Sequence, residues 1–382
     1  MNLNTISDKI VFKSLKFIKH GNIQLINYDN KNYNFGNPKE KLSVKLKINK
    51  PGLTYKIIQN GDIGLAEAYM RGDFETDNLT NLIELTAKNI QLTYKFSGLF
   101  DFSIINYIKN IFIKNNKSRS KENISKHYDL GNEFFSLWLD PSLTYSSAIF
   151  EKNESNLESA QKNKYQKLLS LINPKSGDKI LEIGCGWGGF AEFVGKNYDV
   201  KMDCITISKK QFDYASKRIF ENGLNEKVKI KLKDYRDIKE KYNSIASIEM
   251  IEAVGKNYLS NFFNTIKSNL SEKGLAAIQT ITIDDDLFER YKTKQDFIRK
   301  YIFPGGFLPS KKSLYNLSSS KGLLINSYDS YGFHYSNTLQ LWRNEFINKW
   351  DQISRQGFDI NFKRMWHFYL SYCEAGFKSK NI

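Results

Sequence analysis

A glycine-rich turn directly after a short apolar segment constrains the fold of this chain more than any other feature. Residues Lys179–Ile183 predict a buried strand, and Gly184, Gly186 and Gly188 follow it, ahead of a segment with helical periodicity. Glycine lets the backbone pass close to a ligand because it carries no Cβ. The order strand, glycine turn, helix therefore predicts a ligand-binding loop at the carboxyl end of a strand in a parallel sheet.

The spacing of these glycines narrows the kind of ligand. It is Gly-x-Gly-x-Gly rather than Gly-x-Gly-x-x-Gly, which disfavours a dinucleotide. No Gly-Lys-Ser/Thr sequence follows, which argues against a P-loop for ATP or GTP. A glycine turn that binds nothing stays the alternative interpretation.

Strands and helices alternate from Lys179 onward. Apolar runs between turn residues predict the strands, amphipathic segments predict the helices, and Ser208 is a suitable N-cap for the second of these helices. The predicted strands are Lys179–Ile183, Met202–Thr206, Val228–Leu232, Ile245–Ile248 and Leu275–Ile281, and the predicted helices are Phe190–Asn197, Ser208–Asn222 and Asn257–Asn269. Such a βαβ series predicts an α/β fold, with a parallel sheet and helices on both faces.

The first part of the chain has a different pattern. Residues 21–60 read as short strands separated by turns, and residues 61–91 as two helical segments. We predict a small α+β domain over residues 1–105, a basic linker over 106–126, and an α/β domain over 127–382. The linker is either a solvated connector or a stripe that meets lipid headgroups, where each Lys or Arg contributes roughly 1 kcal/mol.

The composition bears on partners and location. The formal net charge of +16, from 57 Lys and Arg against 41 Asp and Glu, suits an anionic partner. The cysteines Cys185, Cys204 and Cys373 show no paired spacing, so we expect no disulfide framework, no metal site, and a cytoplasmic setting. No apolar run has the length of a signal peptide or a membrane span, so we expect any membrane contact to be peripheral.

The glycine turn resembles motif I of class I S-adenosylmethionine-dependent methyltransferases, although Ile205–Gln211 lacks the acid that commonly ends the second strand. Together with four further segments, this variant closely resembles the cyclopropane fatty acid synthase family. These segments are His127–Ala148, Glu249–Tyr258, Lys300–Ser310 and His334–Trp342. Residues 61–76 also resemble the N-terminal domain of the longer, phospholipid-acting members. The resemblance implies a Rossmann-like, seven-stranded class I methyltransferase sheet with a smaller N-terminal α+β domain for lipid binding or dimerisation.

The resemblance also implies a set of contacts to S-adenosylmethionine. The residues are Tyr145, Ser146, Glu182, Gly184, Cys185, Gly186, Trp187, Gly188, Thr206, Ser208, Gln211 and Tyr235. Gln211 would replace the usual acidic ribose ligand, because an amide offers a diol both an acceptor and donors. We expect Cys185 to be a small residue in the turn rather than a reactive thiol.

Members of this family transfer the methyl carbon to a cis double bond of an acyl chain, which leaves a carbocation. A bound bicarbonate then removes a proton from the new methyl group and closes a cyclopropane ring. The implied ligands of that ion are Ser147, Glu252, Gln279, Ile281 and Tyr335. Ser147 stands where the family has a Cys and Gln279 where it has a His. Gln279 can donate a hydrogen bond but cannot take up a proton as His can.

These two departures keep another product open, a methylene- or methyl-branched acyl chain. A small-molecule or RNA methyltransferase is a third reading, and a lipid carrier without activity a fourth. The chain lacks the Asn/Asp-Pro-Pro-Tyr/Phe motif of exocyclic-amine methylases and any recognised RNA-binding module, so we expect no nucleic acid partner. The expected partners are unsaturated phospholipid acyl chains, an anionic inner-membrane surface bound peripherally, and a second copy in a homodimer.

Overall fold

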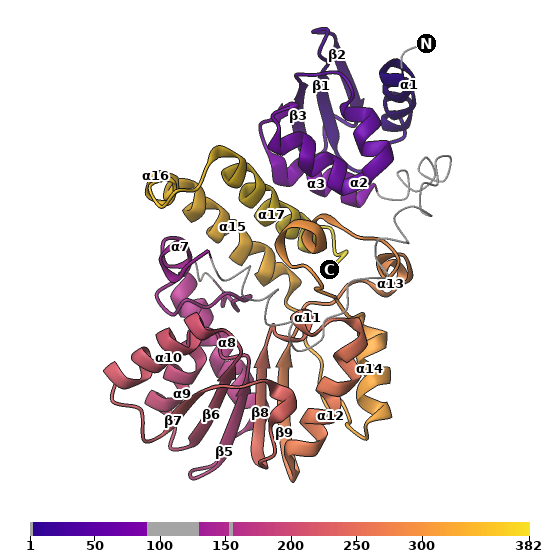
Figure 1. Cartoon of the computed structure of the whole chain (residues 1–382). Helices are drawn as coiled ribbons and strands as arrows, with labels where there is room; N and C mark the ends of the chain where they lie inside the picture. Colours follow the sequence, from indigo (N-terminus) through magenta and orange to yellow (C-terminus); the bar gives the residue numbers. More distant parts are fainter. Residues whose placement is uncertain (1–2, 90–129, 153–155) are drawn as a thin grey trace. The chain divides into compact units, whose positions relative to one another are not determined.

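The computed structural model describes residues 3–89, 130–152 and 156–382 (Figure 1). The described residues divide into two compact units. The first unit contains residues 3–89, 290–302 and 342–382, and the second contains the remainder, so the division falls within helix α15 (Gly332–Asn348). Each unit is described by itself.

The first unit is built on a four-stranded sheet in the order β2-β1-β3-β4. Its strands are β1 (Asn22–Ile26), β2 (Asn32–Gly36), β3 (Ser43–Ile48) and β4 (Phe74–Thr76). Strand β1 pairs antiparallel with β2 and parallel with β3, and β3 pairs antiparallel with β4. In β3, alternate residues are buried, which places its apolar side chains inward and its lysines outward.

Helices from both ends of the chain accompany this sheet. They are α1 (Leu3–Leu15), α2 (Leu53–Met70), α3 (Leu79–Lys88), η3 (Ile298–Ile302), α16 (Trp350–Ser354) and α17 (Ile360–Lys378). Helix α2 begins eight residues before the predicted start at Gly61, where it has a kink with a positive φ of 58°. Helix α17 packs on α2 and α3, and its buried Glu374 accepts hydrogen bonds from Thr80 and Arg343.

This packing differs from the predicted division of the chain. The prediction assigned all of residues 127–382 to the α/β domain, whereas residues 290–302 and 342–382 belong to the same compact unit as residues 3–89. Thr80 and Glu374 lie 294 residues apart in the chain, so no local pattern indicates their contact. The predicted boundaries at 105 and 126 fall outside the described residues and stay a prediction.

The second unit contains a five-stranded sheet in the order β7-β6-β5-β8-β9, and every pairing is parallel. The strands are β5 (Lys179–Ile183), β6 (Lys201–Thr206), β7 (Val228–Leu232), β8 (Tyr242–Ile248) and β9 (Leu270–Gln279). The predicted α/β fold with a parallel sheet is confirmed. The described residues contain five strands of this sheet where seven were expected, because the chain beyond β9 forms only an isolated bridge between Ile283 and Ser310.

Three helices cover one face of this sheet: α8 (Leu157–Ile172), α9 (Gly189–Asn197) and α10 (Lys209–Glu221). Their apolar side chains share a buried cluster with residues of all five strands. Helix α12 (Leu259–Asn269) packs along β9, and α14 (Lys311–Ser320) packs on α12 (Figure 1). The shorter elements are α7 (Asn132–Ser136), η1 (Tyr235–Asp237), α11 (Ile251–Val254), η2 (Lys256–Tyr258) and α13 (Asp285–Tyr291).

Across the part of the chain that the structure describes, every helix is too short or too polar to cross a membrane.

Candidate functional site

The glycine turn joins β5 to α9 and is fixed to the end of β6. The backbone N–H groups of Gly184 and Cys185 both donate to the carbonyl oxygen of Ile205, at 3.0 and 2.9 Å. A Cβ at Gly184 would come within 2.6 Å of the Met250 side chain, whereas a Cβ at Gly186 would meet nothing within 4 Å. Gly184 is therefore required for close packing, and Gly186 faces open space that suits the backbone-lined cradle of a ligand.

A polar cluster lies at the end of β6, next to this turn. The Thr206 hydroxyl donates to the amide oxygen of Gln211 at 2.9 Å, and the Ser208 hydroxyl accepts from the Gln211 backbone N–H. Ser208 is thus the N-cap of α10, as the sequence predicts. Since Thr206 holds the amide oxygen, the Gln211 amide nitrogen is the atom suited to donate to a ribose hydroxyl.

Aromatic side chains connect the glycine turn to the segment before α8. The Trp187 indole N–H donates to Asn132 at 2.8 Å, and its ring centroid lies 5.0 Å from that of Phe135. The Tyr145 ring centroid lies 5.4 Å from that of the same Phe135 and 5.6 Å from that of Trp138. The structure therefore brings two of the predicted cofactor residues, Tyr145 and Trp187, around one aromatic cluster.

Tyr235, in η1 after β7, stands apart from that cluster and packs edge-on against Phe262. Its hydroxyl is buried and has no hydrogen-bond partner among the described residues. Burial raises the pKa of this phenol to about 12, so it is a neutral donor at physiological pH. A buried donor without a partner fits a site that a bound ligand completes.

Two predicted residues of the glycine-turn region, Glu182 and Cys185, are buried. Glu182 pairs in register with Cys204 and Ala246, which belong to the core beneath α8–α10, so its side chain points to that face. Burial raises the pKa of Glu182 to about 7. Burial also raises the pKa of the Cys185 thiol well above its usual value, which makes Cys185 a poor nucleophile.

Lys164 of α8 is a buried polar residue that sequence reasoning missed. Its side chain is fully buried, and its ammonium group donates to the Ser146 hydroxyl at 2.6 Å. The neighbouring Gln161 donates to the Ser146 carbonyl oxygen at 3.0 Å. Burial lowers the pKa of Lys164 to about 7, against the opposing charges of Glu249, Asp140 and Glu182. The sequence analysis predicted no helix over this segment, so the apolar spacing around Gln161 and Lys164 was the only available signal.

Two carboxylates follow β8, and the second of them is the predicted Glu252. Its Oε1 accepts hydrogen bonds from the Thr280 hydroxyl, at 2.8 Å, and from the backbone N–H of Ile281. Its Oε2 is buried without a hydrogen-bond partner among the described residues. Burial, and then the charge of Glu249, raises the pKa of Glu252 to about 8, so Glu252 holds a proton at neutral pH.

The first carboxylate belongs to Glu249, which sequence reasoning did not single out. Its Oε1 accepts from the Ser147 backbone N–H and from the Gln279 side-chain amide, both at 2.8 Å. Its Oε2 accepts from the Tyr335 hydroxyl at 2.6 Å. The available signal was the Glu-x-x-Glu spacing of Glu249 and Glu252 directly after a predicted strand.

The predicted bicarbonate ligands therefore converge only in part. Glu252 and Ile281 contact each other, while Ser147, Gln279 and Tyr335 donate to the Glu249 carboxylate. Three of the donors expected to hold a free anion are already bound to a carboxyl group of the chain itself. A bicarbonate ion does not fit there while Glu249 holds these three hydrogen bonds.

The beginning of α15 fixes the segment that carries Ser147. The backbone N–H of Ala148 donates to Thr338 at 3.1 Å, and that of Phe150 donates to His334 Nδ1 at 3.0 Å. Tyr335 lies on the same turn of α15 as these two acceptors. This helix therefore sets both the Ser147 N–H and the Tyr335 hydroxyl against Glu249.

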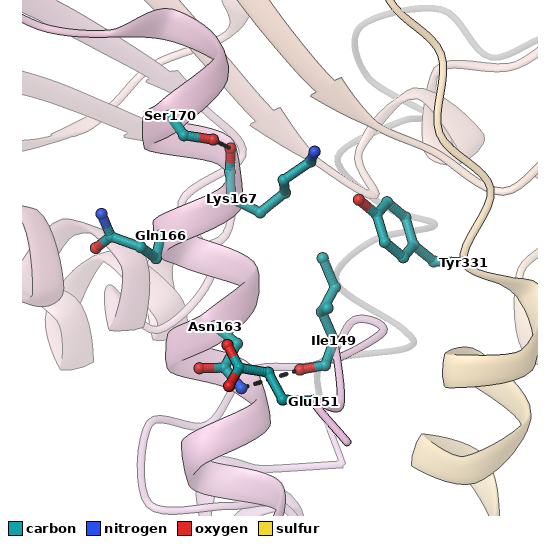
Figure 2. A pocket seen from close by; sticks show the side chains of 7 residues that line it. All are labelled: Ile149, Glu151, Asn163, Gln166, Lys167, Ser170 and Tyr331. Atoms are coloured by element: carbon teal, nitrogen blue, oxygen red, sulfur yellow. Dashed lines mark hydrogen bonds between the residues drawn. The ribbon is translucent and has the colours of Figure 1, made fainter. Parts of the chain in front are cut away.

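A groove of about 280 Å³ lies on the outer side of α8 (Figure 2). Its lining is Ile149, Glu151, Asn163, Gln166, Lys167, Ser170 and Tyr331. None of the predicted site residues lines this groove. Within the described ranges, no group of three or more His, Cys, Asp and Glu side chains is arranged to hold a metal ion.

Two family models match the chain, and known relatives resemble it over most of its length. The mycolic acid cyclopropane synthetase model matches residues 115–382, and a domain of unknown function (DUF7884) matches residues 11–95. The chain is 34% identical to a tuberculostearic acid methyltransferase of Mycobacterium tuberculosis, over 87% of this chain and 80% of that protein. It is 33% identical to the cyclopropane-fatty-acyl-phospholipid synthase of Escherichia coli K12, over 88% of this chain and 85% of that protein.

Solved structures of two cyclopropane synthases also resemble this chain. A cyclopropane synthase from Mycobacterium tuberculosis matches with a TM-score of 0.64 at 28% identity, over 68% of this chain and 94% of that one. A mycolic acid cyclopropane synthase in complex with SAH and CTAB matches with the same TM-score, identity and coverage. The fold is that of class I S-adenosylmethionine-dependent methyltransferases. The chain therefore belongs to the mycolic acid cyclopropane synthetase family, a family of S-adenosylmethionine-dependent methyltransferases that modify lipid acyl chains.

Proposed function

We propose that this protein transfers the methyl carbon of S-adenosylmethionine to the cis double bond of unsaturated acyl chains in membrane phospholipids, and that the product is a cyclopropane fatty acid. The observation that carries the proposal is a half-buried pair of carboxylates, Glu249 and Glu252, at the carboxyl end of β8, next to the strand that leads into the glycine turn. The similarity to an Escherichia coli cyclopropane-fatty-acyl-phospholipid synthase supports the substrate and the product.

The residues at the carboxyl ends of β5, β6 and β7 fit S-adenosylmethionine. Gly186 faces open space, Gln211 presents an amide nitrogen, and Tyr235 has a buried hydroxyl without a described partner. When bound, S-adenosylmethionine supplies an electrophilic methyl group on a sulfonium. The chain must align the alkene with that methyl and exclude water, and such positioning can contribute roughly 7–11 kcal/mol.

The alkene becomes a carbocation once it has taken up the methyl group. Aromatic faces stabilise a cation without reacting with it, by about 0.5–2 kcal/mol each. Phe135, Trp138 and Tyr145 form the aromatic cluster nearest to the glycine turn, and we assign this role to them. A base must then remove one proton from the new methyl group. No step runs through bicarbonate, because three of its five predicted ligands already donate to Glu249.

A methylene-branched product is the second candidate, and two observations favour it. Gln279 occupies the place of the His that the sequence resemblance implies, and a tuberculostearic acid methyltransferase is among the similar proteins. The two products differ in one step: a hydride shift along the chain before the proton is lost gives a methylene branch, and direct loss closes the ring. Both lose a proton from the transferred methyl group.

The remaining parts of the proposal concern domains and partners. We propose residues 1–105 as the lipid-binding or dimerisation domain, 106–126 as the basic linker and 127–382 as the catalytic domain, with helix α17 packed on helices α2 and α3. The net charge of +16 supports peripheral binding to an anionic inner membrane in the cytoplasm. The linker lysines lie outside the described residues.

The test combines purified protein, S-adenosylmethionine with a labelled methyl group, and vesicles of unsaturated phospholipid. Gas chromatography with mass spectrometry of the released fatty acids should show a gain of one labelled CH₂, and NMR should separate a ring from a methylene branch. Label in RNA or in a small molecule, with none in the lipid, would contradict the proposal. Absence of saturable S-adenosylmethionine binding would favour a lipid carrier.

A further inference from the structure

We propose that the Glu249 carboxylate is the base that removes the proton from the transferred methyl group, and that it replaces a bound anion with a side chain of the protein. This inference rests on the proposed function and names the proton acceptor of that reaction. Three features support it: the hydrogen bonds to Glu249, its backbone conformation, and its neighbouring charges.

The hydrogen bonds define a complete anion site. A backbone N–H, an amide N–H and a phenol O–H, from Ser147, Gln279 and Tyr335, all donate to the two oxygens of Glu249. A carboxylate and a bicarbonate present the same planar O–C–O group to such donors. Oε1 accepts two of the bonds and Oε2 only one, which leaves Oε2 with a lone pair for an incoming proton.

The backbone of Glu249 is held in an uncommon conformation. Its φ is +47°, in the left-handed region, and its N–H donates to the carbonyl oxygen of Gln279 at 2.8 Å. This conformation costs a residue with a Cβ roughly 1–2 kcal/mol, and such strain persists where the surrounding structure enforces it, often at active sites. A glycine would avoid the cost, so a glutamate here is consistent with a use for its side chain.

The neighbouring charges divide the two carboxyl groups into different roles. Burial raises the pKa of Glu249, and it raises the pKa of Glu252 to about 8, helped by the charge of Glu249. Glu249 is stabilised as an anion by its three donors and by the buried Lys164. Glu252, with a pKa of about 8, therefore holds its proton at neutral pH, whereas the three donors around Glu249 favour the charged form of that carboxyl group.

The step balances without any further reagent. A C–H bond of the transferred methyl group breaks, its electron pair forms the last C–C bond of the ring, and the proton passes to Oε2 of Glu249. The acyl chain loses its positive charge and Glu249 its negative charge. For a methylene branch, the same electron pair forms a C=C bond instead. Glu249 then returns the proton to solvent before the next turnover.

The test uses the full chain in buffer freed of carbon dioxide, with Glu249→Gln, Glu249→Gly and, as the matched control, Glu272→Gln on the exposed part of β9. We expect wild-type turnover to be the same with and without added bicarbonate. Glu249→Gln should lower kcat by about 10²–10⁴-fold. Glu249→Gln should also increase the kinetic isotope effect measured with S-adenosylmethionine that carries a deuterated methyl group, which a purely structural change would not do. Glu272→Gln should match the wild type in both measurements.

Glu249→Gly gives a second and independent readout. Glycine suits the backbone conformation, and its lack of a side chain leaves the three donors for an added anion. We expect calorimetry to show formate or bicarbonate binding to this variant but not to the wild type, and the same anions to restore part of its turnover. Bicarbonate-dependent wild-type turnover, or wild-type kcat in Glu249→Gln, would overturn the inference. A third outcome separates the two proposals. If the wild type adds no CH₂ to lipid and binds no formate, while Glu249→Gly does bind formate, only the proposed function is overturned.

Discussion

The hydroxyl of Tyr335 donates to Oε2 of Glu249 over 2.6 Å, and this bond joins the first turn of α15 to the end of β8. The bond stabilises the charged form of the carboxylate and so lowers the pKa of Glu249 against the effect of burial. Residues from two distant parts of the chain thus set the basicity of one group.

Replacing Tyr335 with Phe should shift the pH dependence of the enzyme. Loss of the hydroxyl raises the pKa of Glu249, because a hydrogen bond to its charged form is gone. Since the base must be ionised, the acid limb of kcat against pH should move upward by about one pH unit. Tyr315→Phe, at an exposed tyrosine of α14, is the control. An unmoved limb would show that Tyr335 does not tune Glu249.

Replacing Glu252 with Gln should raise stability most at high pH. The pKa of Glu252 is raised to about 8 in the folded protein, so the folded state binds a proton that the unfolded state has already lost. The free energy of unfolding of the wild type therefore falls as the pH rises from about 4.5 to about 8, by about 1.4 kcal/mol per pH unit. The gain in Tm over wild type should be small near pH 5 and largest near pH 9. Equal gains at both pH values would contradict this linkage.

Replacing Lys164 with Met should have the opposite pH dependence. Burial lowers the pKa of Lys164 to about 7, so the unfolded chain binds a proton that the folded chain lacks between about pH 7 and 10.5. Because of Lys164, the free energy of unfolding of the wild type should increase as the pH rises through that range, whereas that of the variant should not. Urea unfolding near pH 6 and near pH 9 measures the difference. We expect the free energy of unfolding of Lys164→Met, relative to that of the wild type, to be larger near pH 6 than near pH 9. The reverse order would contradict this prediction.

Two alanine substitutions in the glycine turn should separate packing from ligand binding. Gly184→Ala places a Cβ within 2.6 Å of Met250 at a positive φ of 86°, so it should cost roughly 1–3 kcal/mol of unfolding free energy. Gly186→Ala meets no atom within 4 Å, so its cost should be limited to the roughly 1–2 kcal/mol of an alanine at a positive φ of 53°. Its methyl group enters the ligand cradle, so the Kd for S-adenosylmethionine should rise by at least about tenfold, about 1.4 kcal/mol.

Calorimetric titration and thermal unfolding of the two variants check this distinction. If Gly186→Ala binds S-adenosylmethionine as tightly as the wild type does, the open side of the turn is not the cofactor side. The two glycines then differ only in packing.

The sheet of the second unit followed closely from local patterns. The predicted strands at 179–183 and 228–232 agree residue for residue with β5 and β7, because apolar runs between turns mark buried parallel strands. Strands β8 and β9 begin earlier than predicted, at Tyr242 and Leu270. Tyr242 pairs with Leu270, but polar residues follow each of them before the apolar run resumes, so periodicity does not reveal these strand starts.

The candidate site was predictable where residues lie close in the sequence. The glycine turn after β5 and the Ser208 cap of α10 agree with expectation. Lys164 was missed because its use depends on the segment around Ser146 folding against α8. Glu249 was missed because its donors come from three separate segments of the chain.

The amino-acid sequence by itself determined the order of strands and helices, the position of the glycine turn and the family of the protein, since each depends on neighbouring residues and their periodicity. Only the tertiary structure decided which carboxylate meets the anion donors, and that the last helix packs on α2 and α3. Hydrogen bonds between Ser147, Glu249, Gln279 and Tyr335 span 188 residues of chain, and no local pattern encodes which of several acceptors such donors will find.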